Sequence, residues 1–231
     1  MTIGPEVKAL LWDLDGTLID SFQIFSGVLL EVVALNSLMT PEEEAMRSNF
    51  HGTLEDSIRK ALALSDPAVF AKVIDDFLRI QEDYYHTPDD HISPDALDLA
   101  RRAKAAGLQQ VVVTNRAHRD RGSASPRHIV EHSVLKTLIG DVICSDDTPF
   151  RKPDKRVMND FLGRTGLRAD QLLVIGDQHV DAELAFNLGA PAVLISRSGD
   201  AIPYLDQTNE SHATVEVVTS LTQVLLYRAT G

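Results

Sequence analysis

Six short apolar runs, most of them rich in β-branched residues, recur along the chain and constrain its fold more than any other feature. Several are apolar at successive positions rather than at alternate ones, as in parallel strands that helices cover on both faces. Helical patterns fill the intervals between them, for example at about Pro126–Thr137 and Asp154–Thr165. This alternation predicts an α/β fold with a doubly wound parallel sheet. The runs are Val7–Leu14, Leu108–Thr114, Asp141–Ser145, Gln171–Gly176, Pro191–Ser196 and Thr214–Val218.

The interval between the first two runs breaks this alternation. It contains only helical patterns, at about Phe22–Leu38, Pro41–Phe50, Leu54–Leu64 and Pro67–Tyr85. We therefore predict a small all-helical unit, residues 21–89, inserted after the first strand and packed as its own bundle. Residues 1–20 and 90–231 would form the α/β core.

Composition narrows the class of protein. No apolar run approaches the ~20 residues that span a bilayer, and the N-terminal MTIGPEVK lacks the basic start and apolar stretch of a signal peptide. The single cysteine, Cys144, excludes an intrachain disulfide and a cysteine-based metal cluster. A net charge of −12 argues against a nucleic-acid partner. We expect a cytoplasmic protein without membrane association.

The first polar motif, WDLDGTLIDS, follows the first run and contains Asp13 and Asp15. Ligands of open α/β sheets gather at such strand ends, and residues two apart in a strand share a side. Two neighbouring carboxylates repel each other unless a cation binds or one of them is protonated. Both solutions suit phosphoryl transfer, with one carboxylate attacking phosphorus and the other donating a proton. Taken alone, the motif is also typical of an ordinary strand-end turn.

Three further motifs follow later runs. Thr114 and Asn115 offer a hydroxyl and an amide to phosphoryl oxygens, and Lys152 in FRKPD offers a fixed positive charge. Asp177 and Asp181 in IGDQHVD offer oxygen ligands of the kind that Mg²⁺ prefers. Each has an ordinary alternative: a loop start, a solvated lysine, or a helix N-cap at Asp181.

The order and content of the four motifs resemble those of the haloacid dehalogenase superfamily, from Val7 to about Val218. The helical insertion resembles the cap of the phosphoglycolate phosphatase and β-phosphoglucomutase branch. The resemblance implies a Rossmann-like core, a cap that closes over the site, and a magnesium-dependent phosphatase that acts on a small phosphorylated metabolite.

The resemblance also implies a role for each motif residue. Asp13 would be the nucleophile that accepts the phosphoryl group, and Asp15 the general acid and base. Thr114 and Lys152 would bind the phosphoryl group, Lys152 also neutralising charge during catalysis. The Mg²⁺ ligands would be Asp13, the backbone carbonyl of Asp15, Asp177 and Asp181.

Other functions remain open. A phosphomutase uses the same core and differs only in whether water or a sugar phosphate takes the phosphoryl group. A non-catalytic binding protein could retain the scaffold. A dehalogenase is less favoured because a departing halide needs no proton from Asp15. Gln178 and Arg116 also depart from the pattern of relatives, which leaves the particular substrate unpredicted. The sequence does not predict the oligomeric state.

Positive charge is concentrated in two stretches of this acidic chain, residues 116–128 and Arg151–Arg156. Such a rim can focus an anionic ligand, and arginine suits a carboxylate or a second phosphate on the substrate. We therefore consider Arg116 and Arg119 as substrate-binding candidates. The alternative is that these arginines pair with surface carboxylates or mediate self-association. The first stretch contains Arg116, Arg119, Arg121 and Arg127, against Asp120 alone.

Overall fold

The computed structural model describes residues 2–50, 53–119, 122–199, 201–202 and 214–226. Its centre is a parallel sheet of six strands in the order β4-β3-β2-β5-β6-β7. All six predicted strands are confirmed, each a little shorter than its apolar run. Their bounds are β2 Ala9–Trp12, β3 Gln109–Val113, β4 Asp141–Ile143, β5 Leu172–Gly176, β6 Ala192–Ile195 and β7 Val215–Val218.

The sheet is doubly wound, as predicted. From β2 the chain forms β3 and β4 on one side, then crosses to the other side to form β5, β6 and β7. Leu11 of β2 lies opposite Val111 on one neighbour and Val174 on the other. The strand order thus reverses at β2, where ligands of such sheets bind.

Both faces of the sheet are buried, which explains the successive apolar positions. Leu10 and Trp12 belong to one hydrophobic cluster, whereas Ala9 and Leu11 belong to a second cluster on the opposite face. Helices α5 and α6 pack on the first face and α7 and α8 on the second. Their bounds are α5 Pro94–Ala105, α6 Pro126–Glu131, α7 Asn159–Thr165 and α8 His179–Leu188.

Two predicted helices are interrupted. The helix expected from Pro126 to Thr137 ends at Glu131, and a 3₁₀ turn at Val134–Thr137 follows, capped by the Ser133 hydroxyl. The helix expected from Asp154 begins as a 3₁₀ turn, because the Asp154 carboxylate accepts from the N–H of Arg156. Polar side chains that bond to nearby N–H groups break continuous helices in this way.

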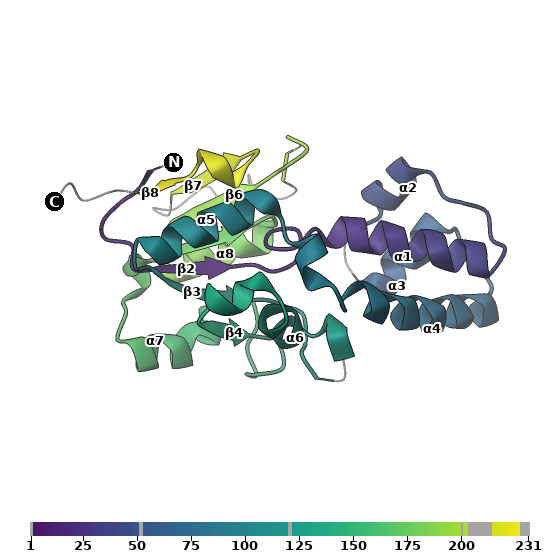
Figure 1. Cartoon of the computed structure of the whole chain (residues 1–231), viewed down its shortest axis with the longest axis horizontal. Helices are drawn as coiled ribbons and strands as arrows, with labels where there is room; N and C mark the ends of the chain where they lie inside the picture. The colour runs from purple at the N-terminus through teal and green to yellow at the C-terminus, as the bar shows by residue number, and fades with distance from the viewer. Residues whose placement is uncertain (1, 51–52, 120–121, 200, 203–213, 227–231) are drawn as a thin grey trace.

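Between Ser21 and Tyr84 the described residues form helices joined by turns and contain no strand, as predicted. These helices lie together at one end of the elongated molecule, away from the sheet (Figure 1). Phe25 and Phe77 pack between the first and last of them, with ring centroids 5.7 Å apart. The helices are α1 Ser21–Leu35, α2 Glu43–Ser48, α3 Leu54–Ala61 and α4 Pro67–Tyr84. Division into two domains at residues 20 and 90 stays a prediction.

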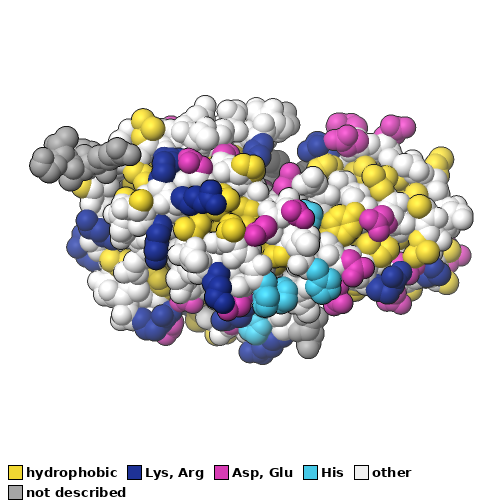
Figure 2. Space-filling view, viewed as in Figure 1, with side chains coloured by type: hydrophobic (Ala, Val, Ile, Leu, Met, Phe, Trp, Pro, Cys, Tyr) yellow, Lys and Arg dark blue, Asp and Glu magenta, His cyan; other side chains and the backbone are white. Residues whose placement is uncertain are grey.

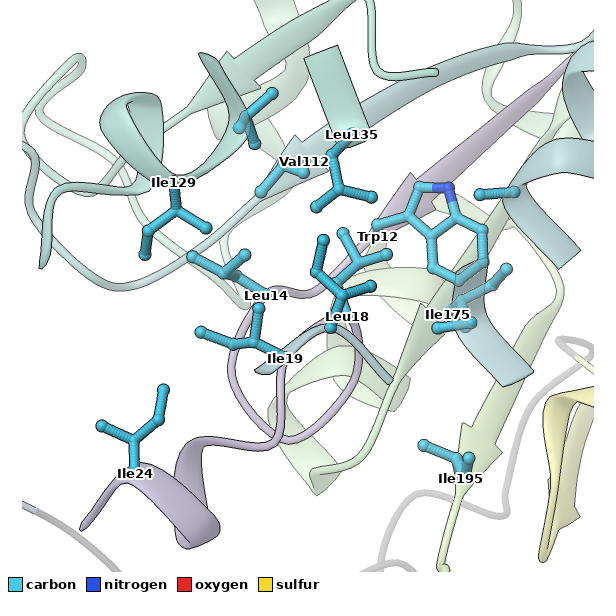
Figure 3. Packing of buried hydrophobic residues seen from close by; sticks show 14 of the residues in the cluster. Trp12, Leu14, Leu18, Ile19, Ile24, Val112, Ile129, Leu135, Ile175 and Ile195 are labelled. Atoms are coloured by element: carbon cyan, nitrogen blue, oxygen red, sulfur yellow. The ribbon is translucent and has the colours of Figure 1, made fainter. Parts of the chain in front are cut away.

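The hydrophobic cluster on the α5 side does not stop at the sheet. Figure 3 shows buried side chains from Trp12 through Leu14, Leu18 and Ile19 toward Ile24 of α1. The buried residues of α1–α4 are therefore continuous with the cluster that covers this face of the sheet. This continuity fixes the loop that carries Asp13 and Asp15, which lies between the two parts.

Two observations concern the chain ends and the surface. Thr2–Ile3 (β1) and Leu225–Leu226 (β8) form a short parallel pair that the sequence patterns did not predict. On the face in Figure 2, many Lys and Arg side chains lie over the end that holds the sheet, whereas Asp and Glu are prominent over α1–α4. Among the described helices, none has the length and apolar character that crossing a membrane requires.

Candidate active site

The carboxyl ends of the central strands bring the motif residues together around Lys152. The Lys152 Nζ donates to Asp13 Oδ1 and to Asp181 Oδ1, each at 2.6 Å. All three side chains are less than 10% exposed, and they come from the loops after β2 and β4 and from the first turn of α8. Residues far apart in the chain thus form one buried polar centre.

The loop after β2 approaches this centre closely. The N–H of Asp13 donates to the carbonyl of Ile175, which continues the sheet pairing past the end of β2. Gly16 has a φ of 76°, and a Cβ at this position would lie 2.2 Å from Asp177 Oδ2. Glycine permits both the backbone conformation and the approach of the first motif to the fourth.

The fourth motif is shaped by the start of α8. Gln178 is the N-cap of this helix, so Asp181 lies in its first turn and is not the N-cap that one interpretation of the sequence expected. The fully buried Asp181 carboxylate accepts from the N–H of Gln178 at 3.2 Å, in addition to Lys152. A negative charge is favourable at a helix N-terminus, so the helix helps to hold this carboxylate.

Burial and crowding shift the acid strengths at this centre. Burial raises the pKa of Asp13 to about 7, an effect that Lys152 opposes and that Asp181 and Asp15 reinforce. Desolvation, followed by the charges of Asp13 and Asp181, raises the pKa of Asp177 well above its usual value. Burial would lower the pKa of Lys152, but the two carboxylates beside it raise it. Without a cation, the site holds more negative charge than it favours.

The donor set fits a hard divalent cation. One oxygen each from Asp13, Asp177 and Asp181 lie within 4.8 Å of one another. Three carboxylates face a single lysine, and oxygen ligands of this kind suit Mg²⁺. The side chain of Asp15 does not join the group, because it is held by Arg116. Only its backbone carbonyl is available for the role that the resemblance implies.

The second motif supports the centre from β3. Thr114 is 4% exposed, and its hydroxyl oxygen accepts from the N–H of Arg116 at 3.0 Å. Its own hydroxyl proton has no acceptor among the residues that the structure describes, so it can donate to a phosphoryl oxygen. Asn115 donates from Nδ2 to the carbonyl of Lys152 at 3.0 Å, so its amide holds the lysine loop. A direct contact between Asn115 and phosphate stays a prediction.

The arginines of the first basic stretch are paired with aspartates. Arg116 forms an ion pair with Asp15. Arg127 Nη2 lies 2.8 Å from Asp147 Oδ2. Arg119 is 69% exposed, with Nε 3.9 Å from Asp146 Oδ2. These contacts agree with the alternative of pairing between arginine and carboxylate, while substrate binding by Arg116 and Arg119 stays a prediction. Arg121 and Asp120 lie outside the described residues.

Sequence reasoning missed two residues at the site. Arg197, just beyond β6, donates to the carbonyls of Gly16 and Thr17 at 2.6 and 3.2 Å and thereby fastens the first motif loop. Its place after a strand end was a usable signal. Tyr85, at the end of α4, is 1% exposed and contacts Arg116. No sequence pattern distinguishes it from a tyrosine of the helical core.

Known proteins are similar to this chain in sequence. The family model described as haloacid dehalogenase-like hydrolase matches residues 10–195. A phosphoglycolate phosphatase of Rhodospirillum rubrum is 29% identical over 202 residues, covering 82% of this chain and 79% of that protein. An (S)-2-haloacid dehalogenase of Pseudomonas putida is 30% identical over 183 residues, covering 77% of this chain and 71% of the other.

Solved structures share the fold. The crystal structure of a subfamily IA hydrolase of the same superfamily, from Geobacter sulfurreducens PCA, has a TM-score of 0.71 at 19% identity. The alignment covers 94% of each chain. Since the identity is low, this likeness concerns the α/β fold and its helical insertion, not the substrate.

Proposed function

The chain belongs to the haloacid dehalogenase-like hydrolase family, and from this premise we propose that it is a Mg²⁺-dependent phosphatase that acts through an aspartyl-phosphate on Asp13. It is a phosphoric monoester hydrolase, as its phosphoglycolate phosphatase relatives indicate. The observation that carries the finer proposal is the double contact of Lys152 with Asp13 and Asp181 beside the Asp177 carboxylate.

Asp13 suits the role of nucleophile. Lys152 holds its Oδ1, and Oδ2 accepts no hydrogen bond from the residues that the structure describes. In the first step a carboxylate oxygen of Asp13 bonds to phosphorus and the ester P–O bond breaks. Asp15, protonated on one oxygen and held by Arg116 through the other, gives its proton to the departing alkoxide. The products of this half-reaction are the alcohol and an acyl phosphate on Asp13.

Hydrolysis of the acyl phosphate reverses these roles. Asp15 takes a proton from a water molecule as the water oxygen bonds to phosphorus, and the bond between phosphorus and Asp13 breaks. Inorganic phosphate leaves and both carboxyl groups return to their starting state. Lys152 and the Thr114 hydroxyl offset the charge of the phosphoryl oxygens during both transfers. A bound Mg²⁺ would act as a Lewis acid on the same oxygens.

We propose a small phosphorylated metabolite as the substrate. Phosphoglycolate is the first compound to test, because several relatives are phosphoglycolate phosphatases. The helices α1–α4 would act as a cap that limits access of water to the reacting groups. We also propose that the protein acts in the cytoplasm, without a nucleic-acid or membrane partner.

Dehalogenation is the second candidate, because the Pseudomonas putida relative carries that activity in its name. Halide release from carbon needs no proton, so a dehalogenase has no use for a second carboxyl group at Asp15. The presence of Asp15 beside Asp13 favours phosphate esters. Incubation with (S)-2-chloropropionate and assay of released chloride separates the two candidates. A phosphomutase would instead transfer phosphate between sugar phosphates without net phosphate release.

The proposal is tested by release of inorganic phosphate from p-nitrophenyl phosphate and phosphoglycolate, with Mg²⁺ or with EDTA. We expect activity only with Mg²⁺ and a loss of roughly 10³-fold or more in Asp13→Asn, which keeps the shape but removes the attacking charge. Asp170→Asn, an exposed carboxylate change, is the matched control and should keep full activity. Substantial turnover by Asp13→Asn, or chloride release in place of phosphate release, would contradict the proposal.

A further inference from the structure

Arg116 lies between the Asp15 carboxylate and the end of helix α4. We infer that Arg116 is a positioning residue, which sets the direction of the Asp15 carboxyl group and links it mechanically to α1–α4 through Tyr85. The inference rests on the proposed function, in which Asp15 is the proton donor. It differs from substrate binding by Arg116, which predicts other kinetics.

The contact with Arg116 orients the Asp15 carboxylate in addition to pairing with its charge. Arg116 Nε donates to Asp15 Oδ2 at 3.0 Å, while Nη2 donates to Oδ1. A planar guanidinium fork that meets both oxygens of a carboxylate determines the plane of that carboxylate. The Arg116 side chain is 17% exposed and that of Asp15 is 30% exposed, so the contact is partly buried.

The remaining face of the guanidinium group is held by α4 and by the loop after β3. Arg116 Nη1 donates to Tyr85 Oη and to the carbonyl of Ala124, each at 3.0 Å. The guanidinium carbon lies 5.2 Å from the centroid of the Tyr85 ring. Because these contacts hold the guanidinium group in one orientation, they also determine the orientation of the Asp15 carboxyl group that it binds.

The backbone of Arg116 lies in the loop just after β3, whereas the tip of its side chain contacts the end of α4. Its N–H bonds to the Thr114 hydroxyl and its carbonyl accepts from the N–H of Ser145, which fastens the residue between β3 and β4. Tyr85 is the C-cap residue of α4. The backbone of Arg116 is therefore fixed between β3 and β4, whereas its guanidinium group would follow a movement of α4.

A second contact makes the link specific to this end of α4. The Ser123 hydroxyl donates to the carbonyl of Glu82 at 2.7 Å, one turn before Tyr85. The segment that follows Arg116 and the last turn of α4 are thus joined twice. A rotation of α1–α4 against the sheet would displace Tyr85, and through Arg116 it would change where Asp15 points. The inferred link thereby couples cap position to delivery of the proton.

Such coupling has a kinetic signature. A proton from Asp15 is essential when the departing alkoxide is strongly basic and nearly dispensable for p-nitrophenolate. Misdirection of Asp15 should therefore slow alkyl phosphates while sparing p-nitrophenyl phosphate. Binding of a second substrate anion by Arg116 predicts a different result, a higher KM confined to substrates that carry such an anion.

The experiment compares Arg116→Ala, Arg116→Lys and Tyr85→Phe with the parent protein on p-nitrophenyl phosphate, ethyl phosphate and phosphoglycolate. For Arg116→Ala we expect kcat on both alkyl phosphates to fall roughly 100-fold, with less than about a 3-fold change on p-nitrophenyl phosphate and a nearly constant KM. Arg116→Lys, which keeps the charge but not the fork, should recover only part of the loss. Tyr85→Phe should show a smaller loss with the same selectivity.

Arg164→Ala is the matched control, because Arg164 also bridges two aspartates, Asp141 and Asp160, but lies on α7. It should not alter the kinetics. Equal losses on all three substrates would overturn the inference. So would a KM increase confined to phosphoglycolate, which would assign Arg116 to the substrate carboxylate. If Arg116→Ala does not fold, Arg116→Lys and Tyr85→Phe decide the question.

Hydrogen–deuterium exchange tests the link without any catalytic readout. The N–H groups of Tyr85 and His86 bond to carbonyls in the last turn of α4. Asp15→Asn, which weakens the grip on Arg116, should speed exchange at these amides several-fold, as should Arg116→Ala, whereas Arg164→Ala should not. Unchanged exchange in Asp15→Asn would overturn the link even in an active phosphatase. Absence of phosphatase activity in the parent protein would instead count against the proposed function alone.

Discussion

The two aspartates of the first motif lie two residues apart and have different partners. Asp13 is buried against Lys152, with Asp177 and Asp181 close by, whereas Asp15 turns its side chain to Arg116. This division places one carboxyl group beside a lysine and a candidate cation site, and the other beside an arginine. It suits a reaction in which the two groups have separate roles, one as nucleophile and one as proton donor.

The acidity of Asp13 predicts how the metal-free protein responds to pH. Burial raises its pKa to about 7 from a usual value near 3.8, so the folded state holds this proton more tightly than the unfolded state does. The free energy of unfolding should therefore fall as pH rises from about 4 to about 7, and this contribution should be constant above about 7. Asp13→Asn lacks the titration, so its stability relative to the parent should increase over the same window.

Urea unfolding in EDTA, at pH values between 4 and 8, measures this difference. The slope should be on the order of 1 kcal/mol per pH unit. Asp177 titrates in the same direction, and because the Asp13 charge raises its pKa, the difference between Asp13→Asn and the parent reports Asp13 together with this coupling. A difference that does not vary with pH, or that shrinks as pH rises, would mean that Lys152 and not burial dominates the acidity of Asp13.

At the scale of elements, the site depends on how closely β5 and α8 can approach each other. Gly176 ends β5, and α8 begins three residues later. A Cβ on Gly176 would lie 2.2 Å from Cγ of Asp181. Asp181 cannot retreat easily, because it is fully buried and bonded to Lys152 and the N–H of Gln178. The short junction between β5 and α8 therefore determines the position of the Asp181 carboxylate.

We expect Gly176→Ala to destabilise the protein by about 1–3 kcal/mol, as overpacking usually does, and to weaken Mg²⁺ binding by displacing Asp181. Gly163→Ala is the matched control. Gly163 lies in α7 with no atom within 4 Å of an added Cβ, and both glycines have φ values that alanine adopts. The control should be neutral or up to about 1 kcal/mol more stable. Similar stability and Mg²⁺ affinity in the two variants would refute this account of the junction.

At the scale of the whole molecule, one hydrophobic cluster extends from the sheet to α1–α4, with the carboxylate site beside it. A ligand that binds the folded site but not the unfolded chain stabilises the entire cooperative unit. The cluster explains why the site should report on global stability. The loop of the first motif is anchored in this cluster by the buried side chains of Leu14, Leu18 and Ile19.

Mg²⁺ should therefore raise the melting temperature. At a concentration 100 times the Kd, the gain is about 2.7 kcal/mol, or roughly 5–10 °C for a chain of this size. Asp177→Asn should melt higher than the parent in EDTA, because it removes crowded negative charge, but should lose most of the Mg²⁺-dependent rise. Asp170→Asn should keep that rise. An unchanged Mg²⁺ effect in Asp177→Asn would exclude Asp177 as a ligand.

The sequence alone determined the strands and the places where the motifs follow them. The run Gln171–Gly176 predicted a buried strand because its successive apolar residues suit two covered faces, and the structure has this strand at Leu172–Gly176. Parallel strands bring their carboxyl ends to one edge of the sheet. The sequence therefore predicted that four side chains lie close together, those of Asp13, Lys152, Asp177 and Asp181. Helix ends were predicted less well, because side chains such as Ser133 and Asp154 compete with the helix for backbone N–H groups.

Only the tertiary structure decided what the long side chains contact. A basic residue after a strand can reach substrate, solvent or any carboxylate within several ångströms, so its sequence position does not select a partner. The fold placed Arg116 on Asp15 and Tyr85, and Arg197 on the carbonyls of Gly16 and Thr17. These contacts join segments roughly 30 to 180 positions apart, and the packing of whole elements determines which such segments meet.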